Sequence, residues 1–321
     1  MRRSSWLRGA LVAGAAAAAL PLSSVVVAHA SATDLTGGGS AVFVQTNAPS
    51  GNLIAAYDRQ HDGTLSLHAT YATGGNGGRA VGSGSDPLAS QGALVYDAGS
   101  SLLFAVNAGS DSISVFGVHG DSLDLQQVVA SGGSFPTSIA VHDDALYVLN
   151  TGGSVNVSGF RIRDGKLHAL PGDTRPLGLT ETNPPAFLAS PAEVGFTPDG
   201  GQLIVTRKTN NFIDVFAVRD DGRLAASPVQ TSDGSVPFAF VFSPAAQLDL
   251  VNAAGNLAPS AVDQSGTITP KGAPVANGQA ASCWIALAGD FAYVANTASN
   301  DLSAYHIGDN GTVTLVDATA A

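Results

Sequence analysis

The 321-residue sequence is poor in cysteine and in charge. It has one Cys, 14 Lys+Arg and 25 Asp+Glu, so charged residues make up only 12% of the chain. A single cysteine excludes a disulfide scaffold and any metal site built from several thiolates. The formal net charge of -11 argues against nucleic acid as a partner, because binding a phosphate backbone needs clustered Lys and Arg. What the chain has instead is 38 Gly and 45% hydrophobic residues, a composition that favours short strands joined by tight turns.

The first thirty residues have the pattern of an export signal. Arg2, Arg3 and Arg8 precede an uncharged run that ends in the small-x-small sequence Ala28-His29-Ala30. An uncleaved membrane anchor is the alternative, but the Ala-rich run and its break at Pro21 favour cleavage. Because Ser4-Ser5 follow the arginine pair, Sec export is favoured over twin-arginine export. We therefore predict a signal peptide over 1–30, a linker over 31–40 and a secreted domain over 41–321.

Cleavage of this segment would make the mature chain more acidic and would leave it outside the cytoplasm. Removing 1–30 leaves 11 Lys+Arg against 25 Asp+Glu, a net charge of -14. The mature chain is then an acidic, disulfide-free, exported protein, with no membrane association expected after cleavage. The lack of cystines is typical of a bacterial exported protein rather than of a small eukaryotic secreted domain.

One short pattern recurs six times along the chain. A hydrophobic strand ends at an anchor residue, 43 to 60 residues from the next, and a second strand follows each anchor after nine or ten residues. The anchors are Asn47, Asn107, Asn150, Arg207, Asn252 and Asn296. A turn such as Asp164-Gly165 then leads to a third strand. Asp-Gly and Asn-Gly are strong hairpin signals because such turns need positive φ angles.

A further apolar segment precedes five of the six anchors, for example "SIAVH" from Ser138 and "WIALA" from Trp284. Each full unit therefore contains four strands, here called A to D from the channel outwards. Four short strands in a unit of this length are typical of a β-propeller blade. The predicted fold is an all-β propeller in one domain. The first unit lacks an A segment, so either six blades close imperfectly or a seventh repeat is absent; we favour an incomplete seven-blade plan.

With the repeats aligned, the sequence resembles the seven-bladed β-propeller lactonase family, which includes 6-phosphogluconolactonase and carboxymuconate-lactonising enzymes. The likeness is carried by Ser90–Phe116, by Ser190–Phe216 and by turns such as Asp62–Leu65. It is similar to the exported actinobacterial members, apparently with one repeat fewer. The resemblance implies a ligand site at the channel mouth, on the face that carries the D-to-A and B-to-C loops. It specifies activity poorly, because propellers host many functions.

Candidate catalytic residues lie in the fourth unit. Glu193 begins its A strand, and Arg207 occupies a position that is Asn in every other unit. A carboxylate could activate water, and a guanidinium could stabilise an oxyanion. The two residues could also pair across the hairpin as a structural salt bridge. Lys208 follows Arg207 and is a candidate for substrate binding.

The remaining candidates begin the other A strands. Gln91, Thr137, Phe238 and Trp284 could hold a neutral or sugar-like ligand at the channel mouth, or simply pack around a narrow channel. His142 is expected in an A-to-B turn on the opposite face, and Cys283 as a buried thiol. Two long D-to-A insertions, 73–86 and 171–191, are expected on the ligand face. No histidine pair has a metal-ligand spacing, so neither a metal nor a cofactor is predicted.

The leading interpretation is an exported lactonase-like propeller that hydrolyses or binds a lactone or sugar-acid ligand, as a carboxylic ester hydrolase would. The alternative is a non-catalytic propeller that binds a ligand or a protein at the cell surface. The sequence leaves the substrate and the oligomeric state open.

Overall fold

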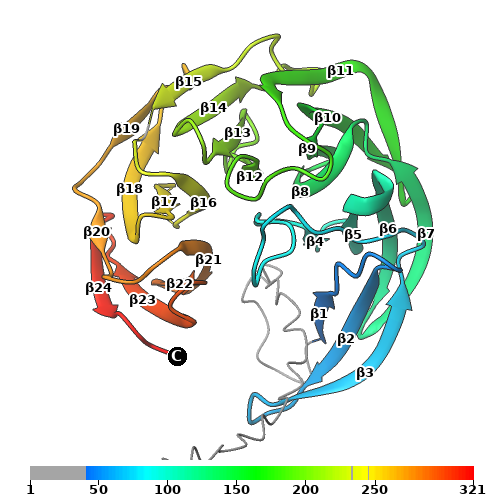
Figure 1. Cartoon of the computed structure of the whole chain (residues 1–321), viewed down its shortest axis with the longest axis horizontal. Coiled ribbons are helices and arrows are strands. Elements are labelled where there is room, and N and C mark those ends of the chain that lie inside the picture. Colours follow the sequence, from blue (N-terminus) through cyan, green and yellow to red (C-terminus); the bar gives the residue numbers. More distant parts are fainter. Residues whose placement is uncertain (1–40, 233, 245) are drawn as a thin grey trace, which may run out of the picture.

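The computed structural model describes residues 41–232, 234–244 and 246–321. The predicted signal peptide and linker therefore lie outside the described residues. Within these ranges the chain forms six antiparallel sheets, which Figure 1 shows arranged around a common axis as the blades of a propeller. The predicted all-β propeller with six recognisable repeats is confirmed.

The blades follow one another in sequence order. Blade 1 contains β1 (Ala41–Gln45), β2 (Leu53–Arg59) and β3 (Leu65–Ala72). Blade 2 contains β4 (Leu94–Asp97), β5 (Leu102–Asn107), the 3-10 turn η1 (Ala108–Ser110), β6 (Ser112–His119) and β7 (Ser122–Ala130). Blade 3 contains β8 (Ser134–His142), β9 (Ala145–Gly152), β10 (Ser154–Arg163) and β11 (Lys166–Thr180). Blade 4 contains β12 (Pro191–Phe196), β13 (Gln202–Arg207), β14 (Phe212–Ala217) and β15 (Val229–Ser232). Blade 5 contains β16 (Pro237–Phe242), β17 (Leu248–Asn252), β18 (Asn256–Val262), β19 (Ile268–Pro270) and β20 (Val275–Ala276). Blade 6 contains β21 (Ser282–Ala288), β22 (Phe291–Asn296), β23 (Asp301–Ile307) and β24 (Val313–Asp317).

Blade 1 differs from the others as the sequence predicts. It has three described strands in the order β1-β2-β3, so β1 takes the inner position and no A strand is present among the described residues. In blades 2, 3, 4 and 6 the order runs from the A strand to the D strand, and in blade 5 the short β19 and β20 both pair with β18.

The hairpin turns adopt the backbone that their sequences require. Asp164 and Gly165, which join β10 to β11, have φ angles of 52° and 72°. Two consecutive positive φ values define the type I′ turn, whose twist matches that of the strands it joins. The Asp-Gly pair therefore determines where this hairpin reverses.

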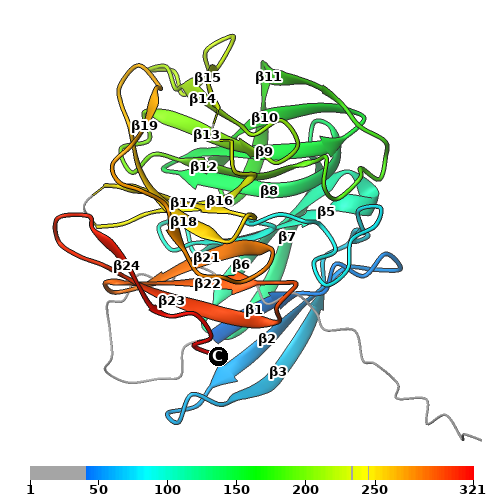
Figure 2. The same cartoon turned by 60° about the vertical axis from the view of Figure 1, so that its left-hand side comes forward.

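The hydrophobic core lies between blades rather than within a single centre. One cluster packs Phe43 and Ile54 of blade 1 against Phe116 of blade 2, and similar clusters join every consecutive pair up to blades 5 and 6. Burying one such large side chain contributes about 1.5–3 kcal/mol. Among the described residues no cluster joins blade 6 to blade 1, and Phe291 and Tyr293 on β22 stay partly exposed. Figure 2 shows the same blades turned by 60°, with β22 and β23 close to the C-terminal end of the chain.

The described part of the chain has no helix long and apolar enough to cross a lipid bilayer.

Candidate functional site

A cavity of about 930 Å³ runs along the axis of the ring. The A strands of blades 2, 3, 4 and 6 form most of its wall, and Figure 1 shows these strands, β4, β8, β12 and β21, at the centre. Blade 6 also contributes Tyr293 and Asp301 from β22 and β23, so the cavity extends along the exposed face of that blade. The surface of the cavity is mostly apolar, which suits a ligand with few charges.

A β-bulge near the start of each of four A strands decides which side chains reach this cavity. The pairing of β8 with β9 skips Thr137, that of β12 with β13 skips Ala192, that of β16 with β17 skips Phe238, and that of β21 with β22 skips Cys283. All four skipped side chains are buried. A one-residue shift moves a side chain to the other face of its strand.

The bulges separate the candidate residues into two groups. Gln91, Glu193 and Trp284 line the cavity. Thr137 and Phe238 do not line it: both are buried bulge residues, so the structure does not bring their side chains to the cavity surface. The prediction of a buried thiol at Cys283 is confirmed, and burial raises the pKa of this thiol to about 11.

Glu193 is the buried carboxyl group of the cavity wall. Its Oε2 accepts a hydrogen bond from the backbone N–H of Phe240 (2.6 Å), and its Oε1 accepts one from Nε2 of Gln91 (3.1 Å). Burial raises the pKa of Glu193 to about 8, and the two hydrogen bonds oppose that rise. The carboxyl group therefore exchanges its proton near neutral pH, which suits an acid or base catalyst.

Gln91 links three blades through its side chain. Its Nε2 donates to Glu193 of blade 4, and its Oε1 accepts from the backbone N–H of Ile285 in blade 6 (2.9 Å). Trp284 adds a second link, because its Nε1 donates to the carbonyl of Ser90 (2.8 Å). These bonds hold Glu193, Gln91 and the Trp284 ring in defined positions around the cavity.

The raised pKa of Glu193 predicts a pH-dependent stability. The unfolded carboxyl has a pKa near the ordinary value of 4.5 and the folded one near 8, so between these values the native state holds a proton that the unfolded state has lost. Its contribution to stability therefore falls as pH rises from about 4.5 to about 8. We expect urea unfolding at pH 5 and pH 8 to show that wild type loses stability relative to Glu193→Gln over this range. A difference between the two proteins that is equal at both pH values would contradict the buried, raised-pKa carboxyl.

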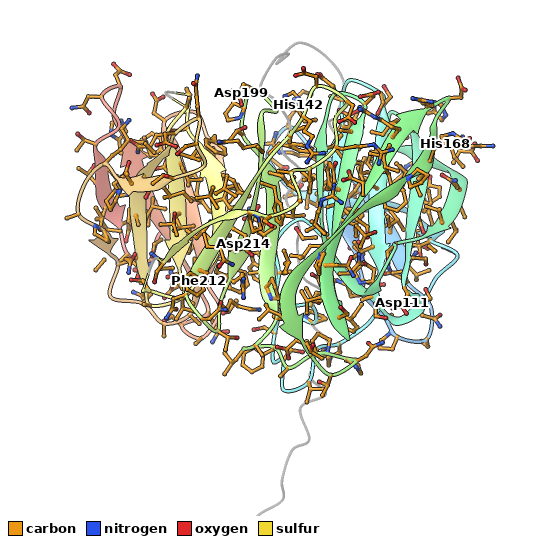
Figure 3. All side chains as sticks on the ribbon, turned by 90° about the horizontal axis from the view of Figure 1, so that it is seen from above. Asp111, His142, His168, Asp199, Phe212 and Asp214 are labelled. Carbon is orange, nitrogen blue, oxygen red and sulfur yellow. The ribbon has the colours of Figure 1, made fainter. Side chains whose placement is uncertain are left out.

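Arg207 lies away from Glu193, and the prediction that they pair is wrong. The bulge at Ala192 places Glu193 opposite Thr206, whereas Nη1 of Arg207 contacts Oδ2 of Asp214 at 3.1 Å. Arg207 also lies over the Phe212 ring, 5.8 Å from its centroid. Its side chain is buried and does not line the cavity. Figure 3 shows Asp214 in the body of blade 4 and Phe212 toward one rim.

Lys208 is buried behind the cavity and is not among its lining residues. Its Nζ donates to the carbonyl of Ala89 (2.7 Å) and to Oγ of Ser190 (3.3 Å), and lies 5.2 Å from the centroid of the Phe238 ring. Burial lowers its pKa to about 8, and the charge of nearby Asp86 opposes that shift. Lys208 therefore links the segments that follow the first D-to-A insertion and end the second, and its predicted role in substrate binding stays a prediction.

The two insertions meet each other over the channel. Val81 forms a parallel bridge with Ala186, and its N–H donates to the carbonyl of Pro185 (2.8 Å). The second insertion is shorter than predicted, because β11 continues to Thr180. Ser85 of the first insertion lines the cavity, so this loop forms part of its boundary.

His142 lies at the opposite end of the channel, as the sequence predicts. Figure 3 shows His142 and Asp199 at one rim of the ring, with Asp111 and Phe212 toward the other. His142 nevertheless lines the cavity, which the sequence did not indicate, and one ring nitrogen lies 3.3 Å from the carbonyl of Pro198.

Sequence reasoning also missed the polar residues that blade 6 contributes. Asn296, Thr297, Asn300 and Asp301 line the cavity, although they belong to the end of a B strand, the B-to-C turn and the start of the C strand. The signal for them was the exposed side of β22, where Phe291 and Tyr293 alternate with buried residues. The alternation of residues along β22 does not by itself show that one face of the blade is exposed. That conclusion also requires knowing whether a neighbouring blade covers this face.

Comparisons with known proteins agree with this architecture. Residues 154–281 match the family described as "Lactonase, 7-bladed beta-propeller". No curated protein matches the chain by sequence. A putative 6-phosphogluconolactonase from Bacteroides fragilis superposes with a TM-score of 0.64 at 16% identity, over 88% of this chain and 81% of that one.

Two further solved structures are similar. The periplasmic gluconolactonase of Pseudomonas aeruginosa has a TM-score of 0.63 at 19% identity, with 87% of this chain and 82% of that one covered. A protein from Lactobacillus plantarum has a TM-score of 0.66 at 15% identity, with 88% and 82% covered. At such identities the likeness shows the fold. Together with the family match, it confirms that this chain is a lactonase-like β-propeller in which the structure describes six blades where the matching family has seven.

Proposed function

We propose that the axial cavity binds a small uncharged lactone or sugar-like ligand and that Glu193 supplies the acid–base group for its hydrolysis. The observation that carries the proposal is a carboxyl group with a pKa of about 8 in the wall of a mostly apolar cavity of about 930 Å³. A perturbed titratable group in a large concave site is the usual mark of a functional site.

The charge of the cavity wall favours an uncharged ligand. Among the described residues, the cavity wall includes the ionisable side chains of His142, Glu193 and Asp301 and has neither Lys nor Arg. An anionic ligand such as a phosphorylated lactone would meet carboxylates and no fixed cation. The neutral rings of Trp284, Tyr293 and Phe196 offer apolar and stacking surface instead.

In the proposed reaction, ionised Glu193 takes a proton from a water molecule, and the water oxygen attacks the lactone carbonyl. The protonated Glu193 then returns the proton to the ring oxygen as the ester bond breaks, which gives a hydroxy acid. The hydrogen bonds from Gln91 and Phe240 hold the carboxyl group in place through both steps.

A second function, ligand binding without catalysis, is favoured by one observation. Both oxygens of Glu193 already accept hydrogen bonds, and among the described residues the cavity wall has no Arg or Lys to stabilise an oxyanion. On this alternative Glu193 and Gln91 orient the ligand, and the propeller acts as a receptor or surface protein.

A hydrolysis screen distinguishes the two functions. The purified chain is assayed against uncharged five- and six-membered lactones and against a phosphorylated lactone, with spontaneous hydrolysis subtracted. We expect uncharged lactones to be preferred, with a rate that rises with pH and levels off above about 8, because Glu193 must be ionised to act as the base. Binding without turnover would support the second function, and neither binding nor turnover would contradict both.

We also propose that the protein acts outside the cytoplasm, where it meets small molecules from the surroundings. The support is the sequence of residues 1–30, with its three arginines, uncharged run and Ala-His-Ala end. Detecting the mature chain in the culture supernatant, with an N-terminus after Ala30, would test this.

A further inference from the structure

Three side chains that could bind a metal converge at the outer edge of the ring, away from the channel. They are Asp58 on β2, His68 on β3 and Asp121 in the turn between β6 and β7, and their ligand atoms all lie within 4.8 Å of one another. Nδ1 of His68 lies 3.7 Å from Oδ2 of Asp58 and 3.6 Å from Oδ2 of Asp121. The group therefore joins blade 1 to blade 2, whose strands lie side by side in Figures 1 and 2.

A β-bulge aims His68 at this point. Ala56 pairs with Ala69, but the next residue of β2, Tyr57, pairs with Leu67, so His68 has no partner in the ladder. The same bulge occurs in blade 2 at Gln126 and in blade 6 at Val316. Bulges re-aim one side chain out of the regular alternation. Among these three repeats, blade 1 has an imidazole at the re-aimed position.

The two carboxylates of the cluster favour binding of a cation. Two carboxylates from different blades face the same nitrogen, and no Lys or Arg of the described residues forms an ion pair with either of them. Their mutual repulsion is relieved when a positive ion lies between them. The excess of acidic over basic residues raises the local concentration of cations further.

We propose that Asp58, His68 and Asp121 form a binding site for a divalent metal ion of the zinc class, which fastens blade 1 to blade 2. Zinc binds imidazole nitrogen and carboxylate oxygen at about 2.0–2.2 Å, so two ligands of a tetrahedral ion lie about 3.4 Å apart. The separations of 3.6 and 3.7 Å agree with that spacing to within a few tenths of an ångström. Calcium and magnesium prefer oxygen ligands throughout, so an imidazole at the centre of the cluster disfavours them.

The position of the site gives the ion a structural consequence. Blade 1 has three described strands, and its inner strand β1 has one free edge among the described residues. Its main attachment to the ring is the apolar cluster shared with blade 2. A metal that bridges Asp58 and His68 to Asp121 adds a second attachment at the outer edge. The side chains are 35–41% exposed, so water completes the coordination.

The test uses the full chain without a polyhistidine tag, stripped with EDTA and titrated with ZnCl2 at pH 7.5. We expect calorimetry to give one Zn²⁺ per chain and Tm to rise by about 2–4 °C at saturating metal, because a ligand that binds only the folded state stabilises it. CaCl2 should cause no such rise. His68→Ala and Asp121→Asn should each weaken Zn²⁺ binding at least tenfold while keeping the circular dichroism of wild type.

Asp143→Asn is the matched control. It removes another exposed His–Asp contact, the 3.6 Å contact between His142 and Asp143, where no third ligand of the described residues converges. This variant should bind Zn²⁺ as wild type does. The proposal is overturned if wild type binds no Zn²⁺, or if neither His68→Ala nor Asp121→Asn changes the affinity. The proposal is also overturned if the contacts of His68 with the two aspartates depend on pH but not on metal or EDTA. The cluster would then be held by a protonated imidazole.

Discussion

Replacing Glu193 with glutamine is expected to lower kcat/KM for an uncharged lactone by about 100- to 10,000-fold, the range associated with loss of a general base. Glutamine has nearly the same shape, so the cavity keeps its outline and KM should change little. The variant no longer accepts a proton from water, which removes the transition-state contribution of this side chain. The rise of the rate with pH toward about 8 should disappear with it.

The chain offers a close control for this variant. Glu181 is the other glutamate of the sequence, and it follows β11 outside the cavity wall. Glu181→Gln should keep the activity and the pH profile of wild type. Hydrolysis that is unchanged in Glu193→Gln would remove Glu193 from the mechanism, whereas ligand binding retained without turnover in wild type would leave it a role in binding.

Replacing Arg207 with methionine is expected to reduce the free energy of unfolding by about 3–5 kcal/mol, because it leaves a buried carboxylate without its cation. Asp214 is fully buried, and its Oδ2 has Arg207 as its charged partner at 3.1 Å. The loss would show as a lower midpoint in urea unfolding followed by fluorescence. Since domains are stable by only about 5–15 kcal/mol, this is a large fraction of the total.

The other blades suggest how to restore that stability. Asn107 donates to Ser114, and Asn296 donates to Ser303, each seven residues along the chain at 2.8 Å. Arg207 and Asp214 occupy the same two positions in blade 4, also seven residues apart. The double variant Arg207→Asn with Asp214→Ser should therefore recover most of the stability that Arg207→Met loses. A double variant no more stable than the single one would contradict this equivalence. If the double variant recovers stability but loses lactone hydrolysis, Arg207 contributes to the functional site.

Much of the fold could be predicted because it depends on local sequence. The Asp-Gly and Asn-Gly turns specify where hairpins reverse, and alternating apolar residues specify the strands. Repetition of the unit then indicates blades, because one blade cannot bury both of its faces alone. The missing A strand of the first unit was visible for the same reason.

The candidate site was predicted less well, because single-residue shifts decide it. Glu193 and Trp284 were correctly placed at the cavity, but Thr137 and Phe238 were assigned to the same surface one residue out of register. A bulge has no clear signature in one sequence, yet it turns a side chain from the channel to the core. The sequence shows that Arg207 departs from the repeat. Its partner Asp214 also departs from the repeat at the matching position, but the pairing of the two was not predicted.

By itself the sequence determined the repeat, the strand order, the turns and the acidic character of this protein, since each follows from neighbouring residues or from composition. The tertiary structure decided which residues meet. It placed Glu193 against Gln91 and Phe240, Arg207 against Asp214, and His68 between two aspartates of different blades. These contacts join residues from separate strands, most of them on separate blades. Their distances depend on bulges and on blade packing, which local sequence patterns do not encode.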